Sequence, residues 1–339
     1  MVKAKKVVME KALQASLQEY EFDADLAPKD MLIRTHYSLV SAGTETAIYK
    51  GTETWAQFPC TAGYTSVGEV VEVGPDVKGF KKGDLVFAGS HHATHCICTE
   101  SPAAYPILLP EGSDLKRMVY TRMAAVSMTA LRVSDIELGD WAAVTGQGSV
   151  GNCAAQFLAL QGANVIAIDI SPKRLDIAKQ CGIEHTINPQ EQDTVEAVKA
   201  LTGGSGVAAV VEATAAPAVV QECFPLCAPL GEVILLGSPR GEYQTDLTAF
   251  MNNVHLWGNG CITLKGAHEW RYPTPITDGC KHSIRRNCDI IIDLIAREKL
   301  VVDPLMSHVE SPAKCQELHQ GLLHKKNEYI SVIYDWTQV

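Results

Sequence analysis

The sequence lacks several features that would assign it to a special class of protein. Its longest apolar stretches are far shorter than the roughly 20 residues that cross a membrane, and no apolar run follows the basic N-terminus at Met1–Lys6. It has no excess of basic charge, because 29 Lys and Arg stand against 39 Asp and Glu, a net charge of −10. We therefore expect no membrane segment, no signal peptide and no nucleic-acid partner, since phosphate binding needs a basic face.

The cysteines lack the spacing of a disulfide framework or of a metal-binding lobe. There are eleven of them, an odd number scattered from Cys60 to Cys315, and no Cys-x-x-Cys occurs. This usage is typical of a reducing cytosol, so we predict a cytoplasmic protein. The chain does have what an ordinary core requires: 46% of its 339 residues are hydrophobic and the mean hydropathy is +0.02. Its length indicates about two domains.

The first 130 residues read as β-rich, because short β-branched runs alternate with Gly and Pro. Strands are expected at Val67–Val73, Leu85–Phe87 and Ala93–Thr99. In the last of these, the alternation of a strand places Cys96 and Cys98 on one face and His95 on the other. A sandwich or barrel-like unit follows from this pattern.

The pattern changes near Asp140 to alternating strands and helices. Strands are expected at Trp141–Thr145, Val165–Ile168, Val207–Val211 and Glu232–Leu236, and helices at Val150–Leu160, Pro172–Cys181 and Ser283–Glu298. Such alternation indicates a parallel sheet with βαβ crossovers, and so an α/β fold with a doubly wound parallel sheet.

A glycine-rich motif joins the first of these strands to the first helix. It consists of Gly146, Gln147, Gly148, Ser149, Val150 and Gly151. In this context the first glycine permits a tight turn, the second lets the backbone approach a pyrophosphate, and the third allows close helix–strand packing. Asp169 ends the next strand, where a carboxylate accepts hydrogen bonds from a ribose and repels a 2′-phosphate. The motif predicts NAD binding, and Arg174 either flanks the adenine or is a surface residue.

With these segments in view, the whole chain resembles the medium-chain dehydrogenase/reductase superfamily. The resemblance rests on Pro59 and Gly63, Val67–Gly74, Lys82–Val86, Gly139-Asp140 and Val211–Thr214. It implies a β-rich, GroES-like catalytic domain at 1–130 and 300–339 and a Rossmann domain at 131–299. It also implies that Thr214 and Gly237 belong to the cofactor site. Members often pair through an edge strand, so we expect a homodimer or homotetramer with His255–Cys261 as that strand.

The zinc site of the alcohol dehydrogenases in this superfamily has lost its ligands here. The segment that resembles the cysteine ligand region reads Ala42-Gly43-Thr44-Glu45, and the Gly-His-Glu segment reads Gly63-Tyr64-Thr65. Neither Ala42 nor Tyr64 suits a catalytic Zn²⁺, which binds Cys, His or carboxylate. We therefore expect no zinc at the usual family site.

A narrower resemblance concerns the substrate. Ser41–Glu45, Gly63–Gly68 and the histidines after Phe87 are similar to the branch that contains bacteriochlorophyllide dehydrogenases. Phe250–Asn253, residues 271–273 and Asp303–Leu305 are similar to bacterial guloside 3-dehydrogenases, which oxidise a sugar hydroxyl with NAD. The resemblance implies a sugar, glycoside or polyol substrate.

Without zinc, a side chain must take the carbinol proton during hydride transfer. His92 is the first candidate because the pKa of histidine lies near neutrality, with Tyr64, Glu45 and Thr44 positioning the reacting oxygen or relaying the proton. His91, His95, Trp270 and Arg271 are the expected substrate contacts. We predict an NAD-dependent alcohol or sugar dehydrogenase.

Three alternatives stay open at this stage. A zinc polyol dehydrogenase would recruit ligands from Glu45 or from His91–Cys98. A non-catalytic NAD-binding sensor would keep the Rossmann fold without turnover. A quinone-type reductase is weaker, because such enzymes normally prefer NADPH, which Asp169 opposes.

Overall fold

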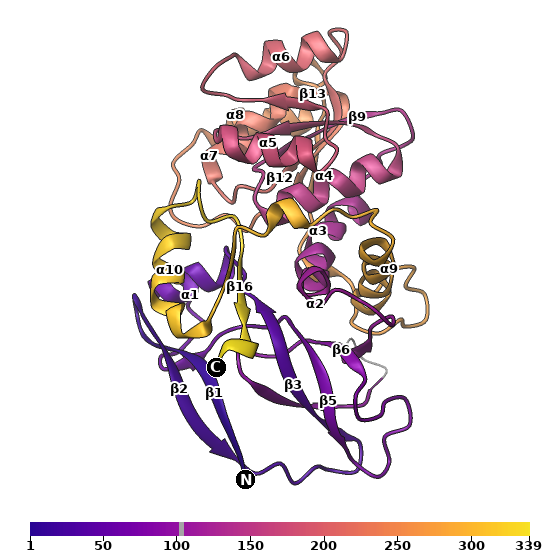
Figure 1. The fold of residues 1–339 in the computed structure, drawn as a ribbon. Coiled ribbons are helices and arrows are strands. Elements are labelled where there is room, and N and C mark those ends of the chain that lie inside the picture. Colours follow the sequence, from indigo (N-terminus) through magenta and orange to yellow (C-terminus); the bar gives the residue numbers. More distant parts are fainter. Residues whose placement is uncertain (102–104) are drawn as a thin grey trace. The chain divides into compact units, whose positions relative to one another are not determined.

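The computed structural model describes residues 1–101 and 105–339. Their contacts form two compact units: unit 1 comprises residues 1–122 and 273–339, and unit 2 comprises residues 123–272 (Figure 1). The sequence placed the boundaries at 130 and 299, so residues 273–299 lie with the β-rich unit rather than with the nucleotide-binding one. They do so because helix α9 (Ile284–Ala296) packs on helix α2 (Leu115–Met118) of unit 1.

Unit 1 is built around two sheets. The three-stranded sheet has the order β2 (Gln14–Phe22), β1 (Val2–Lys11), β4 (Cys60–Thr61). The seven-stranded sheet runs β15 (His308–Glu310), β16 (Val332–Asp335), β3 (Asp30–Leu39), β5 (Ser66–Val73), β6 (Leu85–Ala88), β8 (Ile107–Leu108), with β7 (His95–Thr99) also pairing β3. Strand β16, from the far C-terminal segment, pairs directly with β3 (Figure 1). The three strands predicted in the first 130 residues are therefore present in the structure, as β5, β6 and β7.

Helices α1 (Thr44–Lys50) and α10 (Cys315–His324) cover an apolar core beside the small sheet. This core includes Val7, Met9, Ile48, Tyr49, Leu318, Leu322, Tyr334 and Trp336. Residues from both ends of the chain therefore share one cluster, so this core cannot form without the C-terminal segment. Arg117, in α2, ion-pairs with Glu298 and Asp303 at 2.8 and 2.6 Å and ties the segment after α9 to the same unit.

Unit 2 contains a parallel six-stranded sheet of the doubly wound type (Figure 1). Its order is β11 (His185–Ile187), β10 (Asn164–Ile168), β9 (Trp141–Thr145), β12 (Val207–Glu212), β13 (Cys227–Leu235), β14 (Thr263–Gly266). When the six strands are numbered by their order along the chain, their order in the sheet is 3-2-1-4-5-6, and this order reverses at β9. Ligands of such sheets bind outside the carboxyl ends of the strands at that reversal.

Helices cover both faces of this sheet. They are α3 (Thr121–Val133), α4 (Ser149–Gln161), α5 (Pro172–Gln180), α6 (Thr194–Leu201) and α7 (Pro217–Cys223). Alternate strand residues enter two separate cores: Ala142 and Val144 pack with Leu158 of α4, whereas Ala143 packs with Val198 of α6. Near-continuous apolar strands are the sequence signature of this arrangement, because both faces are buried. The fold class expected from the sequence is confirmed.

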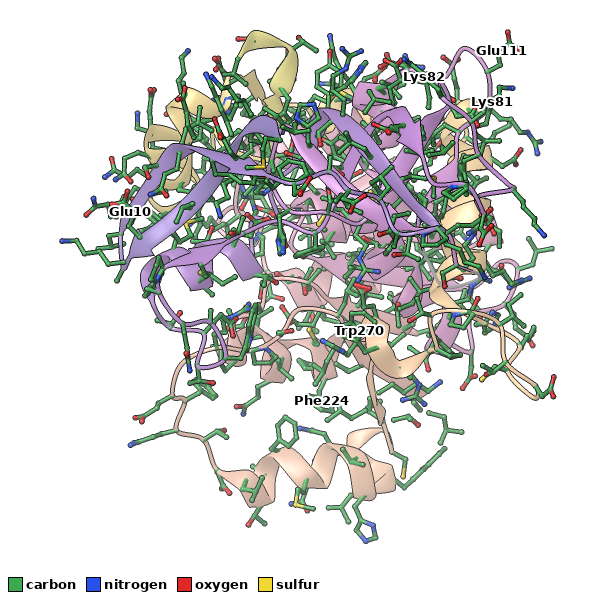
Figure 2. The ribbon with its side chains drawn as sticks, turned by 90° about the horizontal axis from the view of Figure 1, so that it is seen from below. Glu10, Lys81, Lys82, Glu111, Phe224 and Trp270 are labelled. Carbon is green, nitrogen blue, oxygen red and sulfur yellow. The ribbon has the colours of Figure 1, made fainter. Side chains whose placement is uncertain are left out.

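The predicted edge strand at His255–Cys261 is wrong. These residues form the end of helix α8 (Leu247–His255) and the 3-10 turn Trp257–Asn259, and the edge strand is β14, a few residues later. Helix α8 is anchored by Phe250, whose ring meets Phe224 edge-on at 5.1 Å; Figure 2 labels Phe224 beside this helix. Asp246 caps the helix by accepting from the backbone N–H of Thr248, and the helix then runs to His255, where the family resemblance implied the start of a strand.

Within residues 1–101 and 105–339, the longest apolar helical stretches are too short to cross a bilayer.

Candidate active site

The glycine-rich loop connects β9 to α4 and has the geometry that the motif predicts. Gly146 has φ of +86°, and Gly151 lies so close to it that a Cβ on Gly151 would stand 1.8 Å from the Gly146 carbonyl oxygen. Gly148, at the helix N-cap, is different: a Cβ there would meet only the Arg174 Nη1 atom, at 3.9 Å. Two glycines are therefore required by the fold, whereas the absence of a side chain at Gly148 leaves room beside the helix N-terminus for an anionic ligand.

Asp169 is held against this loop. One of its carboxylate oxygens accepts from the Gln147 backbone N–H at 2.7 Å and lies 3.7 Å from Arg174 Nη1. The other accepts from the Ser171 backbone N–H at 2.8 Å. The carboxylate is therefore fixed at the carboxyl end of β10, while the buried Gln147 side-chain amide donates to the Val144 carbonyl at 2.9 Å.

Thr214 and Gly237 follow the carboxyl ends of β12 and β13. The Thr214 backbone N–H donates to the Glu212 carboxylate at 2.6 Å, and its hydroxyl donates to the same oxygen. Its methyl group would lie 2.9 Å from a Cβ on Gly146. Burial raises the pKa of Glu212 above its ordinary value. The structure thus gathers the predicted cofactor residues at one edge of the sheet, including Ser149 and Val150 in the first turn of α4.

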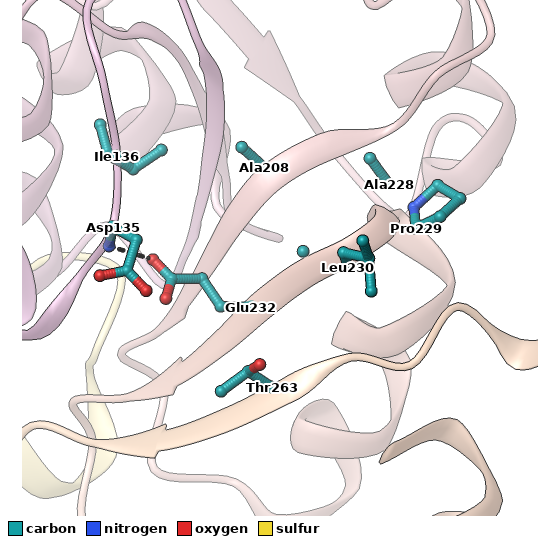
Figure 3. A pocket seen from close by; sticks show the side chains of 9 residues that line it. Asp135, Ile136, Ala208, Ala228, Pro229, Leu230, Glu232 and Thr263 are labelled. Carbon is teal, nitrogen blue, oxygen red and sulfur yellow. Dashed lines mark hydrogen bonds between the residues drawn. The ribbon is translucent and has the colours of Figure 1, made fainter. Parts of the chain in front are cut away.

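A hollow of about 200 Å³ in unit 2 lies elsewhere, at the amino-terminal part of β13 (Figure 3). Its polar wall is Asp135 and Glu232, and the Asp135 backbone N–H donates to Glu232 at 2.9 Å. Lys265 binds both carboxylates, with 2.6 Å to Asp135. Lys265 also donates to the Val133 carbonyl at 3.0 Å, so the cluster joins β13 and β14 to the end of α3.

The centre of unit 1 is a buried Glu45–His92 pair. His92 Nε2 lies 2.9 Å from a Glu45 carboxylate oxygen, and the two side chains are 0% and 1% exposed. The second Glu45 oxygen accepts from the Ser41 backbone N–H at 2.8 Å. Burial alone would raise the pKa of Glu45, but the attraction and hydrogen bond of His92, with smaller contributions from His319 and Ser41, hold it below its ordinary value. Each carboxylate oxygen of Glu45 therefore has a partner within the protein.

The pair continues into the C-terminal segment. His92 Nδ1 lies 2.8 Å from the Ser38 hydroxyl, which also accepts from the Trp336 indole at 2.8 Å. The Tyr334 ring meets His92 edge-on at 5.0 Å, and its hydroxyl lies 3.1 Å from His319 Nε2. Burial lowers the pKa of His319 to about 4. Both ring nitrogens of His92 therefore have protein partners, which leaves neither available for a direct bond to a substrate.

Tyr64 lies at the edge of this network and is half-buried. Its hydroxyl donates to the Ser41 hydroxyl at 2.6 Å, on the residue whose backbone N–H binds Glu45. The preceding Gly63 packs directly on His92: it has φ of +99°, and a Cβ there would stand 2.7 Å from the His92 backbone nitrogen. The guanidinium carbon of Arg122 lies 5.7 Å from the centre of the Tyr64 ring. The Tyr64 hydroxyl is thus linked through Ser41 to the buried Glu45–His92 pair.

The other predicted site residues are placed less closely around this network. Thr44 begins α1 and is half-buried, and His91 is exposed, with Nδ1 3.0 Å from the Gly63 carbonyl. His95 is bonded to neighbouring Thr94 at 3.1 Å on the sheet face opposite Cys96. Trp270 and Arg271 belong to unit 2, in the 3-10 turn Glu269–Arg271, where Trp270 is 61% exposed (Figure 2).

Sequence analysis missed the residues that complete the network in unit 1: Ser38, Ser41, Arg122, His319, Tyr334 and Trp336. Most of these lie far from their partners in the chain; Trp336 is separated from Ser38 by 298 positions. A serine in a strand carries no signal of a bond to a distant indole. The one available signal was Ser41, directly before Ala42 in the segment that resembles the zinc ligand region.

The donor set at the usual family zinc position does not suit the metal. The Ala42 methyl group has no donor atom, and the Tyr64 hydroxyl donates its proton to Ser41. The alternative ligand set is also dispersed: His92 binds Ser38 and Glu45, while Cys96 and Cys98 face each other at 3.9 Å. Across the residues that the structure describes, no three Cys, His, Asp or Glu side chains gather as a metal site.

Comparison with known proteins gives the family. The Zinc-binding dehydrogenase family model matches residues 149–272, and the Alcohol dehydrogenase GroES-like domain model matches residues 27–108. A Putative D-xylulose reductase from Agrobacterium fabrum is 30% identical over 282 residues, 72% of this chain and 80% of that protein. A D-guloside 3-dehydrogenase from Escherichia coli K12 is 28% identical over 280 residues, 74% of this chain and 79% of that protein.

Solved structures agree on the fold. Galactitol-1-phosphate dehydrogenase from Escherichia coli superposes with a TM-score of 0.82 at 16% identity, covering 98% of this chain and 99% of that one. The chain belongs to the medium-chain dehydrogenase/reductase superfamily, as its sequence motifs indicated. The prediction of an oxidoreductase of the alcohol and sugar dehydrogenase class is confirmed at this level.

Proposed function

We propose that this protein is an NAD(H)-dependent dehydrogenase that interconverts a secondary alcohol and a ketone on a sugar, glycoside or polyol, without catalytic zinc. The observation that carries the proposal is the Tyr64–Ser41 hydrogen bond of 2.6 Å. Tyr64 stands where the zinc alcohol dehydrogenases that this chain resembles have a metal ligand. The names of the xylulose reductase and guloside dehydrogenase relatives support the substrate class.

Unit 2 supplies the cofactor site. The open position at Gly148 and the N-terminus of α4 suit a pyrophosphate, and the fixed Asp169 carboxylate suits a ribose diol and repels a 2′-phosphate. When bound, NAD would take up the hydride from the carbinol carbon. Arg174, beside both Gly148 and Asp169, is placed to flank the adenosine.

Unit 1 supplies the proton chemistry. Tyr64 accepts the carbinol proton during oxidation and returns it during reduction, and Ser41 orients the phenolic oxygen. Glu45 and His92 are positioning residues: Glu45 fixes the Ser41 backbone, and His92, itself held by Ser38, fixes Glu45. Thr44, His91 and His95 are proposed to contact the substrate hydroxyls, as are Trp270 and Arg271. We also propose that the protein is cytoplasmic and that it forms a homo-oligomer.

The proposal is tested by measuring NAD reduction against a panel of polyols, glycosides and free sugars, together with the metal content of the purified protein. We expect turnover with members of the glycoside or polyol sets, a preference for NAD over NADP, and less than stoichiometric zinc. Stoichiometric zinc that is lost together with activity on chelation would contradict the zinc-free mechanism. NAD binding without turnover across the panel would instead identify a cofactor-binding sensor.

Replacing Gly148 with Ala is expected to weaken NAD binding by about tenfold, a loss of about 1.4 kcal/mol, because the added methyl group occupies the space beside the helix N-terminus. Thermal stability should not change, since the methyl group would meet only Arg174, at 3.9 Å. Fluorescence titration with NAD measures the affinity. Gly258→Ala is the matched control, at an open glycine in the same unit. If Gly148→Ala binds NAD with the wild-type affinity, the pyrophosphate does not bind beside residue 148.

A further inference from the structure

A buried cation lies beside the proposed proton acceptor. Arg122, in the first turn of α3, is 5% exposed. Its guanidinium carbon lies 5.7 Å from the centre of the Tyr64 ring and 5.7 Å from that of Tyr105. All three residues belong to unit 1. The guanidinium therefore lies near two phenol rings in a place that water screens poorly.

This placement has a direct electrostatic consequence for a phenol. A guanidinium keeps its charge at every pH that proteins tolerate. A cation near an ionisable group favours the anionic form of that group, and the electron-rich ring of a phenolate attracts a cation more strongly than a neutral phenol ring does. Poor screening by water makes both effects larger than at a surface. The partial burial of Tyr64 acts in the opposite direction, because it disfavours the charged phenolate.

We propose that Arg122 is a positioning residue that stabilises the ionised form of Tyr64, and that the Tyr64–Arg122 pair takes over the charge-stabilising role that a metal has in zinc dehydrogenases. This inference rests on the proposed function, because it concerns the same proton acceptor.

Other groups around Tyr64 act in both directions. Ser41 is the hydrogen-bond partner of its hydroxyl, and His91 binds the carbonyl of neighbouring Gly63. The Glu45 carboxylate opposes a second negative charge nearby, but His92 is bonded to it at 2.9 Å and reduces that opposition. Tyr105 competes with Tyr64 for the same cation. The contact with Arg122 favours the phenolate of Tyr64.

The proton step balances with this pair. In the oxidation direction, the carbinol O–H bond breaks and its proton forms the O–H bond of neutral Tyr64. The C–H electron pair leaves with the hydride to oxidised NAD, and the carbinol becomes a ketone. Tyr64 then loses the proton to solvent and regains its negative charge beside Arg122. The oxidant is the NAD of the proposed function.

The test titrates Tyr64 directly, without substrate, by NMR of protein labelled at the tyrosine ring carbon that bears the hydroxyl. The Tyr64→Phe variant assigns the resonance. In the wild type we expect Tyr64 to ionise about one pH unit or more below the value of about 10 for a free tyrosine. Arg122→Gln should move the ionisation upward by a similar amount, Arg122→Lys should restore most of the shift, and the exposed control Arg34→Gln should have no effect.

The outcomes separate this inference from the proposed function. If wild-type Tyr64 ionises at or above the free value, the inference is overturned, and that result does not depend on whether any Arg122 variant folds. The same holds if Arg122→Gln leaves a lowered ionisation in place. If Tyr64 ionises early but Tyr64→Phe turns over at the wild-type rate, the Arg122 inference about ionisation stands and the proton role of Tyr64 fails.

Discussion

Replacing Tyr64 with Phe is expected to lower kcat by about a hundredfold to ten-thousandfold, the usual range for loss of a general acid–base group. The phenylalanine ring keeps the packing near Arg122, while the hydroxyl that donates to Ser41 is lost. NAD affinity should be unchanged, because the cofactor residues lie in unit 2. Steady-state kinetics with the best substrate of the panel, together with NAD titration, measures both quantities.

Two further variants sharpen this result. Ser41→Ala leaves the phenol in place but removes its partner, so we expect a smaller loss of kcat than in Tyr64→Phe. The control Tyr243→Phe removes the hydroxyl of an exposed tyrosine and should leave kcat unchanged. A wild-type kcat in Tyr64→Phe would refute the assignment of Tyr64 as proton acceptor and return attention to Thr44 and His91.

Replacing Glu45 with Ala is expected to lower the free energy of unfolding by about 3–5 kcal/mol, as when one member of a buried ion pair is removed. The change leaves His92 Nε2 and the Ser41 backbone N–H without the carboxylate that both contact, in a site that water does not reach. Urea and thermal unfolding measure the loss. Glu317→Ala, at an exposed glutamate on α10, is the control and should change stability little.

The acid dependence of stability checks the same pair. The pKa of Glu45 in the folded protein lies below its ordinary value of 4.5. Its ionised form therefore stabilises the fold above pH 4.5, and this contribution is lost as the pH falls through the folded-state pKa. The wild type should lose stability in that range more steeply than Glu45→Ala. Parallel acid curves for the two proteins would show that the Glu45 carboxylate does not stabilise the fold.

The dinucleotide loop could be predicted from sequence because its requirements are local. Gly146, Gly148 and Gly151 lie within six positions between a strand and a helix. The fold requires glycine at Gly146 for the turn and at Gly151 for close packing, whereas Gly148 leaves an open approach. Asp169 could be added because a parallel sheet brings the ends of neighbouring strands to one edge. In the structure the three glycines lie between β9 and α4, and Asp169 is bonded to their loop through the Gln147 backbone N–H.

The residues of the proposed proton site could be predicted only in part. Tyr64 and Glu45 were found because they stand in the segments that carry the family resemblance. His92 was chosen for the chemistry of imidazole, but sequence pattern does not report burial, and the structure encloses both of its ring nitrogens. Arg122 was missed, since its contact with Tyr64 joins two segments 58 positions apart, a separation that carries no periodic signal.

By itself, the sequence determined the α/β class, the nucleotide loop and the loss of donor atoms at Ala42 and Tyr64, because these depend on residue type, on periodicity and on short spacing. Only the tertiary structure decided that residues 273–299 pack in unit 1, that Glu45 and His92 are buried together, and that Ser41 and Arg122 flank Tyr64. The physical reason is that burial and charge proximity arise from contacts between distant segments, and such contacts exist only after the strands from both ends of the chain have paired.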